Sequence, residues 1–347
     1  MRREEREGQR PLKVSPSSGS FQHMTESEFD IIRHYFTDRQ SRRADVVAGI
    51  GDDAALLHVA PGSELVVCMD TLVAGVHFPE STAAAAIGHK ALAVNLSDLA
   101  AMGAEPAWAT LSLTLPASHP DWLKAFADAF FALADRHGVQ LVGGDISCGP
   151  LAVTVKAHGF VPAGQALRRR GARPGDRVCV TGTLGDAGLA LHDGVSVPAG
   201  LQARLDFPQP RIDAGLALRG YASAAIDISD GLLADLGHLL EHDGLGAALQ
   251  VDALPRSEAF LAGVQTLGAE GEVLFYELPL SAGDDYELCF TIPEERRNEA
   301  ERRLAEIACD CTVIGVIVEL PGLRCYRDDG ERYHPVSSGY RHFNEAG

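Results

Sequence analysis

Residues 83–103 read Ala83-Ala-Ala-Ala-Ile-Gly-His-Lys-Ala-Leu-Ala-Val-Asn-Leu-Ser-Asp-Leu-Ala-Ala-Met-Gly103. Alanine and leucine are strong helix formers and glycine is a common stop signal, so the stretch predicts a helix over 83–102. Asn95 and Asp98 lie three residues apart and share one face of this helix, among alanine, valine and leucine. Asp98 is therefore either a metal ligand or, with Asn95, part of a hydrogen-bonded polar pair at a helix crossing.

Strands and helices alternate on both sides of this helix. Short apolar runs between turn signals predict strands, and longer periodic runs predict helices. The run at 64–69 ends at Asp70 and is expected to be a buried strand. The first half also has predicted strands at 46–57 (interrupted at 51–53), 108–115, 139–142 and 151–161, and predicted helices at 29–36 and 121–137.

The polar, basic and glycine-containing stretch 162–176 is typical of a domain boundary. Because 347 residues exceed the usual size of a single core, we expect an α/β (α+β) fold with domains 24–163 and 164–347, after a disordered extension at 1–23. The second half has predicted strands at 177–181, 224–228, 278–282, 286–292 and 312–318, and predicted helices at 185–192, 214–219, 232–241 and 294–307.

Composition narrows the class of protein. The net charge of −18 argues against a nucleic-acid or anionic-membrane surface, and no apolar run approaches the roughly 20 residues of a membrane span. The first 20 residues contain no apolar core of a secretory signal. Seven scattered cysteines, an odd number, fit free thiols in a reducing cytoplasm.

Carboxylates gather at six places, most of them next to glycine. Carboxylate oxygens are hard ligands that suit Mg²⁺, which also bridges to substrate phosphates. Several metal ions around a polyphosphate would explain how so acidic a chain binds an anionic substrate. The six places are Gly51-Asp52-Asp53, Asp70, Asp98, Gly143-Gly144-Asp145, Asp227-Ile-Ser-Asp230-Gly231 and Gly283-Asp284-Asp285.

Each of these signals has a plain structural alternative. Asp52 and Asp53 could form a turn, although two adjacent carboxylates repel each other and a metal ion would neutralise them. Ser229 or Asp230 could cap the following helix, a role that does not explain Asp227.

Three further features remain open at the level of residues. His77 either packs as a structural histidine or contacts a ligand. The glycine pattern at 182–188 is as consistent with tight helix packing as with phosphate contact. The arginines at 168–170 form a basic surface that could meet a nucleotide phosphate.

Taken in order, the motifs resemble the thiamine-monophosphate kinase family, in the superfamily of aminoimidazole-ribonucleotide synthetase and selenophosphate synthetase. The resemblance extends over residues 29–343. Its stretches are 49–57 (GIGDDAALL), 69–78 (MDTLVAGVHF), 90–103 (KALAVNLSDLAAMG), 143–145 (GGD), 180–183 (VTGT), 225–232 (AIDISDGL) and 283–290 (GDDYELCF).

The resemblance implies ATP-dependent phosphorylation of thiamine monophosphate to thiamine diphosphate by direct in-line transfer, with several Mg²⁺ ions and no phosphoenzyme. It also implies a homodimer in which the N-terminal strands form a barrel. Because the acceptor phosphate is largely ionised at neutral pH, no general base is expected. By motif, Gly144, Asp145, Arg169 and Ser229 would contact ATP, His77, Asp284 and Tyr340 would contact thiamine phosphate, and Asp53, Asp70, Asp98, Asp145, Asp227 and Asp230 would bind Mg²⁺.

The chain departs from the family at two places. The family tends to have a hydroxyl residue before the aspartate matching Asp70, where this chain has Cys68 and Met69, so metal contacts from these two side chains are questionable. Asp284 stands where the family often has glutamate.

Two alternative functions remain. A selenophosphate synthetase would need a reactive N-terminal cysteine, and the first cysteine here is Cys68. A catalytically silent, dimeric nucleotide-binding protein would not need acidic motifs in both halves.

Overall fold

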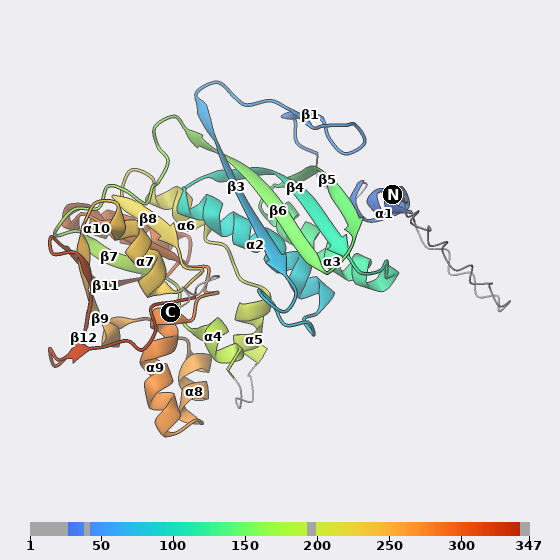
Figure 1. Ribbon diagram of the computed structural model, residues 1–347. Coiled ribbons are helices and arrows are strands. Elements are labelled where there is room, and N and C mark those ends of the chain that lie inside the picture. The colour runs from blue at the N-terminus through green and yellow to red at the C-terminus, as the bar shows by residue number, and fades with distance from the viewer. Residues whose placement is uncertain (1–26, 38–41, 193–198, 341–347) are drawn as a thin grey trace, which may run out of the picture.

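The computed structural model describes residues 27–37, 42–192 and 199–340. The predicted extension at 1–23 lies outside these residues. Two mixed sheets organise the chain, one in each half, with helices packed on them (Figure 1). The α/β (α+β) architecture expected from the sequence is therefore confirmed.

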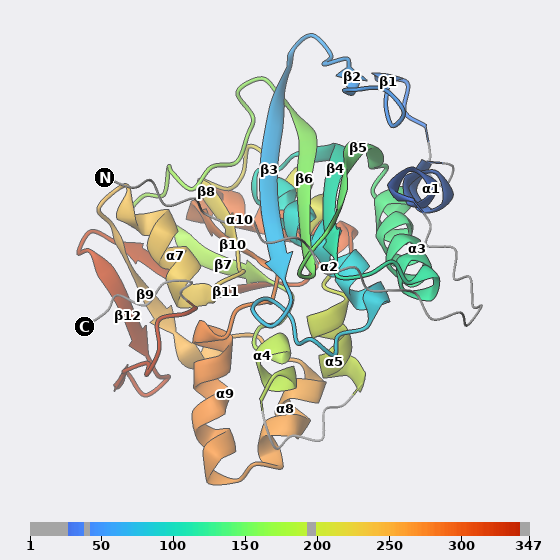
Figure 2. The same ribbon diagram turned by 45° about the vertical axis from the view of Figure 1, so that its right-hand side comes forward.

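The sheet of the first half has four strands in the order β3-β6-β4-β5 (Figure 2). Neighbours are antiparallel except β4 and β5, which are parallel. A short pair, β1 with β2, stands apart from it. The elements are α1 (Glu28–Ile31) with a π-helical turn (Ile32–Thr37), β1 (Val46–Ala48), β2 (Leu56–Leu57), β3 (Ser63–Val73), α2 (Ala84–Ala101), β4 (Glu105–Leu115), α3 (Pro120–Arg136), β5 (Gln140–Cys148) and β6 (Ala152–Pro162).

The sheet of the second half has seven strands in the order β13-β12-β9-β11-β7-β10-β8, antiparallel except for β12 beside β9. Its strands are β7 (Arg177–Thr181), β8 (Ala224–Asp227), β9 (Gly246–Gln250), β10 (Leu288–Ile292), β11 (Cys311–Val318), β12 (Gly322–Tyr326) and β13 (Arg332–Tyr333). The helices are α4 (Asp186–Ala190), α5 (Ala199–Asp206), α6 (Ile212–Leu218), α7 (Leu232–Glu241), a 3₁₀ turn (Val251–Ala253), α8 (Glu258–Gln265), α9 (Ala269–Ser281) and α10 (Glu294–Glu306).

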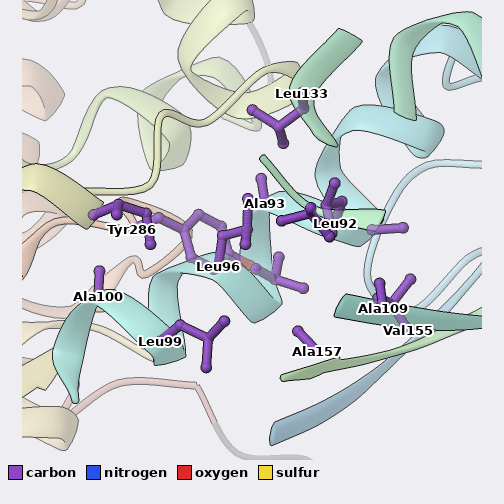
Figure 3. Packing of buried hydrophobic residues seen from close by; sticks show 14 of the residues in the cluster. Leu92, Ala93, Leu96, Leu99, Ala100, Ala109, Leu133, Val155, Ala157 and Tyr286 are labelled. Carbon is purple, nitrogen blue, oxygen red and sulfur yellow. The ribbon is translucent and has the colours of Figure 1, made fainter. Parts of the chain in front are cut away.

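The alanine-rich helix α2 lies between the two halves. On one side it contacts β3, β6 and α3, and on the other it contacts α5, α6 and β8. Figure 3 shows Leu92 and Leu96 of this helix between Val155 and Ala157 of the four-stranded sheet and Tyr286 of the second half. Alanine side chains let surrounding elements approach closely, so one core spans the junction and fixes the site carboxylates relative to one another.

The predicted elements agree with the structure at the strongly patterned segments, including 83–102, 177–181 and 232–241. Two predicted strands are confirmed but longer than expected, and one predicted strand is wrong. The strand at 64–69 continues to Val73, and it is not buried as expected but has one exposed face, because none of the described elements covers that face. Strand β5 continues through Gly143-Gly144-Asp145, since its pairing with β4 holds those residues extended. The run 278–282 ends helix α9 and is not a strand.

Within the described residues, the search for a helix long and apolar enough to cross a membrane finds no candidate.

Candidate active site

A hollow of about 640 Å³ lies where β3 and α2 of the first half meet the loops of the second half. Because its walls come from both halves, the domain packing described above creates it. Its lining includes eight of the residues singled out by sequence as site residues, together with Met69. The eight are Asp70, His77, Asp98, Asp227, Ser229, Asp230, Asp284 and Tyr340, of which Asp284 and Tyr340 come from loops that follow α9 and β13.

Three carboxylates from three elements repel one another at the base of this hollow. Burial, with the charges of Asp227 and Asp70, raises the pKa of Asp98 to about 8. Burial is also the main cause that raises the pKa of Asp227 to about 6 and the pKa of Asp70 above its ordinary value. Arg169, exposed on the 162–176 connection, partly opposes the rise for both Asp98 and Asp227. Such a cluster favours an added cation.

Of two polar side chains on α2, one contacts the carboxylate cluster. Ser97, one residue before Asp98 on α2, donates a 2.8 Å hydrogen bond from Oγ to Oδ2 of Asp227 on β8. Asn95 does not pair with Asp98, because its amide nitrogen donates to the carbonyl of Ala91 on the same helix. The helix-crossing alternative therefore applies to Ser97 and Asp227, a pair that no sequence pattern predicts.

The loop after β8 is organised by a carboxylate that the sequence analysis missed. Oδ2 of Asp235, buried in the first turn of α7, accepts hydrogen bonds from the backbone N–H groups of Ser229, Asp230 and Gly231 at 3.0, 3.1 and 3.2 Å. Burial first, then the charges of Asp227 and Asp230, raises the pKa of Asp235 to about 7. The feature of the sequence that could have identified Asp235 is that it is a single aspartate among leucines near the start of a predicted helix.

The other side of the hollow carries the three residues expected at the acceptor. His77 is half-buried and its Nδ1 accepts a 3.1 Å hydrogen bond from the N–H of Val73. The backbone N–H of Tyr340 donates to the carbonyl of Asp230, which places the tyrosine beside the acidic loop. Asp284 forms a 2.9 Å ion pair with Lys90 of α2, another residue that the sequence analysis did not select.

Three further predicted residues line a second hollow of about 920 Å³, against α1 and the outer strand β5, whereas Arg169 lines neither hollow. Asp53, Gly144 and Asp145 lie there, so a single chain does not bring them together with the residues of the first hollow. Gly144 also has a packing role, because a Cβ there would come 1.8 Å from the carbonyl oxygen of Leu111 on β4.

Cys68 and Met69 point to opposite sides of β3. The thiol of Cys68 faces α2 and donates to the carbonyl of Asn95 at 3.3 Å, and burial raises its pKa. Met69 is 62% exposed on the uncovered face. A protonated thiol and a thioether are both soft groups that suit Mg²⁺ poorly.

Protein groups occupy the space around the glycine-containing segment 182–188. Oδ1 of Asp285 accepts the N–H of Gly185 at 2.9 Å, at the start of α4. Beside it, the fully buried Glu287 accepts hydrogen bonds from Thr181, Arg204 and Arg211. These contacts support the packing interpretation of this pattern.

The chemistry of the first hollow fits Mg²⁺. Its donors are carboxylate oxygens. Burial and then the repulsion among them raise the pKa of Asp98, and a divalent cation would relieve that repulsion. Within the described ranges, no three acidic, histidine or cysteine side chains are close enough to form a complete metal site by themselves. Mg²⁺ commonly uses one or two carboxylates and completes its shell with water and substrate phosphate, so such a site needs no larger protein cage.

Comparison with known proteins follows the same division of the chain. Residues 51–161 match the family model for the N-terminal domain of AIR synthase related proteins, and residues 173–328 match the model for their C-terminal domain. The thiamine-monophosphate kinase of Salmonella typhimurium is 47% identical over 328 residues, which cover 91% of this chain and 98% of that protein.

Solved structures agree with this relationship. The thiamine-monophosphate kinase of Stenotrophomonas maltophilia is 46% identical with a TM-score of 0.76, covering 84% of this chain and 93% of the other. A structure of AaThiL complexed with AMPPCP and TMP is 30% identical with a TM-score of 0.71, covering 94% and 99%. The chain belongs to the thiamine-monophosphate kinase family of AIR synthase related proteins.

Proposed function

We propose that this protein transfers the γ-phosphoryl group of ATP to thiamine monophosphate, giving thiamine diphosphate and ADP. The observation that carries the proposal is the hollow between the halves, where Asp70, Asp98 and Asp227 repel one another beside His77 and Tyr340. The relative AaThiL, solved with AMPPCP and TMP bound, supports both substrates.

The proposed ligands for Mg²⁺ are Asp53, Asp70, Asp98, Asp145, Asp227 and Asp230. When bound, Mg²⁺ neutralises the phosphate charge that would otherwise keep donor and acceptor apart. We leave Cys68 and Met69 out of this set because of their soft sulfur groups. The protein's own part is to hold Asp70, Asp98 and Asp227 on three rigid elements, β3, α2 and β8, with Ser97 and Asp235 bonded to the 227–231 segment.

The reaction needs no general base on the protein. The acceptor oxygen belongs to a phosphate with a second pKa of about 6, so it is mostly ionised at neutral pH. A bond forms between that oxygen and the γ-phosphorus while the bond to the β-phosphate oxygen breaks, and ADP departs. On the protein, Gly144, Asp145, Arg169 and Ser229 are the proposed contacts to ATP, and His77, Asp284 and Tyr340 those to thiamine monophosphate.

A coupled assay across acceptors tests this function. ADP formation with thiamine monophosphate, and none with thiamine or with selenide, is the expected result. Turnover with selenide would favour the synthetase alternative, and no ADP with any acceptor would favour the silent nucleotide-binding protein.

The proposed assembly is a homodimer through the uncovered face of the four-stranded sheet. On β3, Leu65, Val67 and Met69 are 44%, 46% and 62% exposed, a row of apolar side chains that a second copy would cover. In a single chain this sheet is open. A second copy would close the sheet into a barrel. The second hollow of one subunit, with Asp53 and Asp145, would then form one site together with the first hollow of the other subunit.

Mixed dimers test this assembly. Asp98→Asn and Asp145→Asn alone should each lose at least about 100-fold in kcat. If the site is shared between subunits, coexpressing the two variants should restore about a quarter of wild-type activity, because half of the dimers then hold one intact site. No recovery in a mixture shown to contain heterodimers would place both aspartates in one subunit's site.

We also propose the domain division 24–163 and 164–347 and a cytoplasmic location. The division is supported by the change of sheet between β6, ending at Pro162, and β7, beginning at Arg177. The location is supported by seven free cysteines, as expected in a reducing compartment.

A further inference from the structure

Lys90 is a buried lysine that joins the two halves of the molecule. It lies on α2 and is 4% exposed, and its Nζ is 2.9 Å from Oδ1 of Asp284 in the second half. Lysine is almost never fully buried without a charged partner, because an unpaired ammonium loses its hydration. This ion pair therefore determines where the Asp284 carboxylate can lie.

The contacts of Asp284 are one-sided. Oδ1 receives both the ammonium of Lys90 and a 2.9 Å hydrogen bond from the hydroxyl of Tyr286. In the described chain the other oxygen, Oδ2, makes no hydrogen bond, and the side chain, 23% exposed, lines the first hollow. One oxygen is thus held by the protein and the other is available to a ligand.

The backbone around Asp284 also needs support. Asp284 has φ +59° and Tyr286 has φ +50°, both in the left-handed region that costs non-glycine residues free energy. Backbone N–H groups of the two residues donate to the carbonyls of Ser229 and Ile228 at 2.9 and 2.8 Å. Together with the Lys90 ion pair, these bonds hold the 284–286 segment in one conformation.

Lys90 and Asp98 are on the same helix. Eight residues separate them, which is about 12 Å along a helix axis. Ser97 of the same helix bonds to Asp227, so α2 contacts a metal-side carboxylate near its C-terminal end and the acceptor-side carboxylate nearer its N-terminal end. The rigid helix sets the separation between these two carboxylates.

We propose that Lys90 is a positioning residue for the acceptor: it fixes the Asp284 carboxylate so that Oδ2 faces bound thiamine monophosphate. The inference rests on the proposed function. A carboxylate oxygen suits the amino group and cationic ring of thiamine, and it would otherwise be drawn towards the metal ions. Because Lys90 is buried and is not among the residues that line the first hollow, it acts through Asp284, which does line it.

Lys90→Met, which keeps the length of the side chain but not its charge, tests the inference. We expect the KM for thiamine monophosphate to rise about tenfold, as for the loss of one charged hydrogen bond, with the KM for ATP changed less than about twofold. Calorimetric binding of thiamine monophosphate should weaken by the same factor, which provides a measurement independent of turnover. Lys124→Met is the matched control, because it breaks an exposed lysine–aspartate pair on α3.

A double-mutant comparison covers the case in which Lys90→Met does not fold. Asp284→Asn/Lys90→Met removes both charges of the buried pair and so leaves no unpaired ammonium, and its KM for thiamine monophosphate should equal that of Asp284→Asn alone. A further rise in the double variant, or a parallel rise in the KM for ATP, would overturn the inference. Failure of the wild-type protein to phosphorylate thiamine monophosphate would instead overturn the proposed function, so the two failures are distinguishable.

Discussion

The tripeptide Gly-Asp-Asp occurs once in each half of the chain, and its two copies lie in opposite surroundings. In the first copy, Asp52 and Asp53 are exposed, and the N–H of Asp53 donates to Oδ1 of Asp52 in a local turn. Among the described residues no cation pairs with either carboxylate. Their charge is therefore left for water or for a bound ion.

The second copy, Gly283-Asp284-Asp285, is packed against other segments of the protein and paired with their side chains and backbone groups. A Cβ on Gly283 would come 2.4 Å from the carbonyl oxygen of Ser229, so the backbone approach requires glycine. Asp284 is paired with Lys90, and Asp285 is buried with its Oδ1 on the N–H of Gly185. The same tripeptide therefore occurs in two settings. In the first copy the carboxylate charge is available to a metal ion, and in the second copy Lys90 neutralises the charge of Asp284.

Removal of metal ions should give the largest difference between the two copies, because only the first copy lacks a protein cation among the described residues. In excess EDTA, binding of a non-hydrolysable ATP analogue should fall below detection, because uncompensated carboxylates such as Asp53 repel the triphosphate. Thiamine monophosphate binding should weaken less, since Lys90 neutralises Asp284 without a metal. Calorimetry of both ligands before and after Mg²⁺ is restored measures this. Equal ATP affinity with and without EDTA would refute the metal-bridged site.

Within the first copy, the two aspartates should differ. Asp53→Asn should lower kcat by at least about 100-fold, the usual effect of losing an electrostatic group at a transition state. Asp52→Asn retains the oxygen that accepts the N–H of Asp53 and should change kcat by less than about threefold. Both variants should melt within about 2 °C of the wild type, because these side chains are exposed. Equal losses in kcat would mean that the turn itself, and not one ligand, matters.

Sequence patterns predicted the local parts of this molecule well. The alanine-rich helix and the strand at 177–181 follow from composition and spacing, which act over a few residues. The ordered motifs also identified most of the residues that line the first hollow. These inferences need no knowledge of which distant segments meet.

What the sequence could not supply is pairing between distant segments. Lys90 with Asp284, and Ser97 with Asp227, are contacts between helix α2 and the second half. No periodicity encodes which acid a buried lysine will meet. For the same reason, the sequence predicts a carboxylate site at both Gly-Asp-Asp copies alike. It does not reveal that Asp285 is buried against the start of α4, a segment distant in the chain.

The burial of Asp285 makes the stability contribution of the second copy depend on pH. Burial raises the pKa of Asp285 well above its ordinary value of 3.8. The folded protein then holds a proton that the unfolded chain releases, so this residue's contribution to stability declines as the pH rises from about 4 towards the raised pKa.

Asp285→Asn should remove that decline. The free energy of unfolding of the variant, minus that of the wild type, should increase with pH by up to about 1.4 kcal/mol per unit. Urea unfolding in EDTA at pH 5, 6 and 7 measures the difference. Asp328→Asn, at an exposed position in the turn between β12 and β13, is the control, and its difference should change with pH less than that of Asp285→Asn. A difference independent of pH would mean that Asp285 is ionised in the folded protein.

The smallest expected effect concerns Tyr340, which lies beside the acidic loop but belongs to neither copy. Its segment is held in place from outside the hollow, since Glu277 accepts hydrogen bonds from the Tyr333 hydroxyl and the Val336 N–H. The N–H of Tyr340 itself donates to the carbonyl of Asp230. These bonds involve backbone groups or other side chains, and they remain when the Tyr340 ring is truncated.

Tyr340→Ala should raise the KM for thiamine monophosphate by about 2- to 30-fold, the range for loss of a cation–π contact of 0.5–2 kcal/mol with a cationic ring. The KM for ATP should stay nearly unchanged, and Tyr340→Phe, which keeps the aromatic face, should resemble the wild type. Both KM values are to be measured on the same preparation. If only the KM for ATP rose, Tyr340 would be part of the nucleotide site. Asp284, held by Lys90, would then be the proposed contact that the second half makes to thiamine monophosphate.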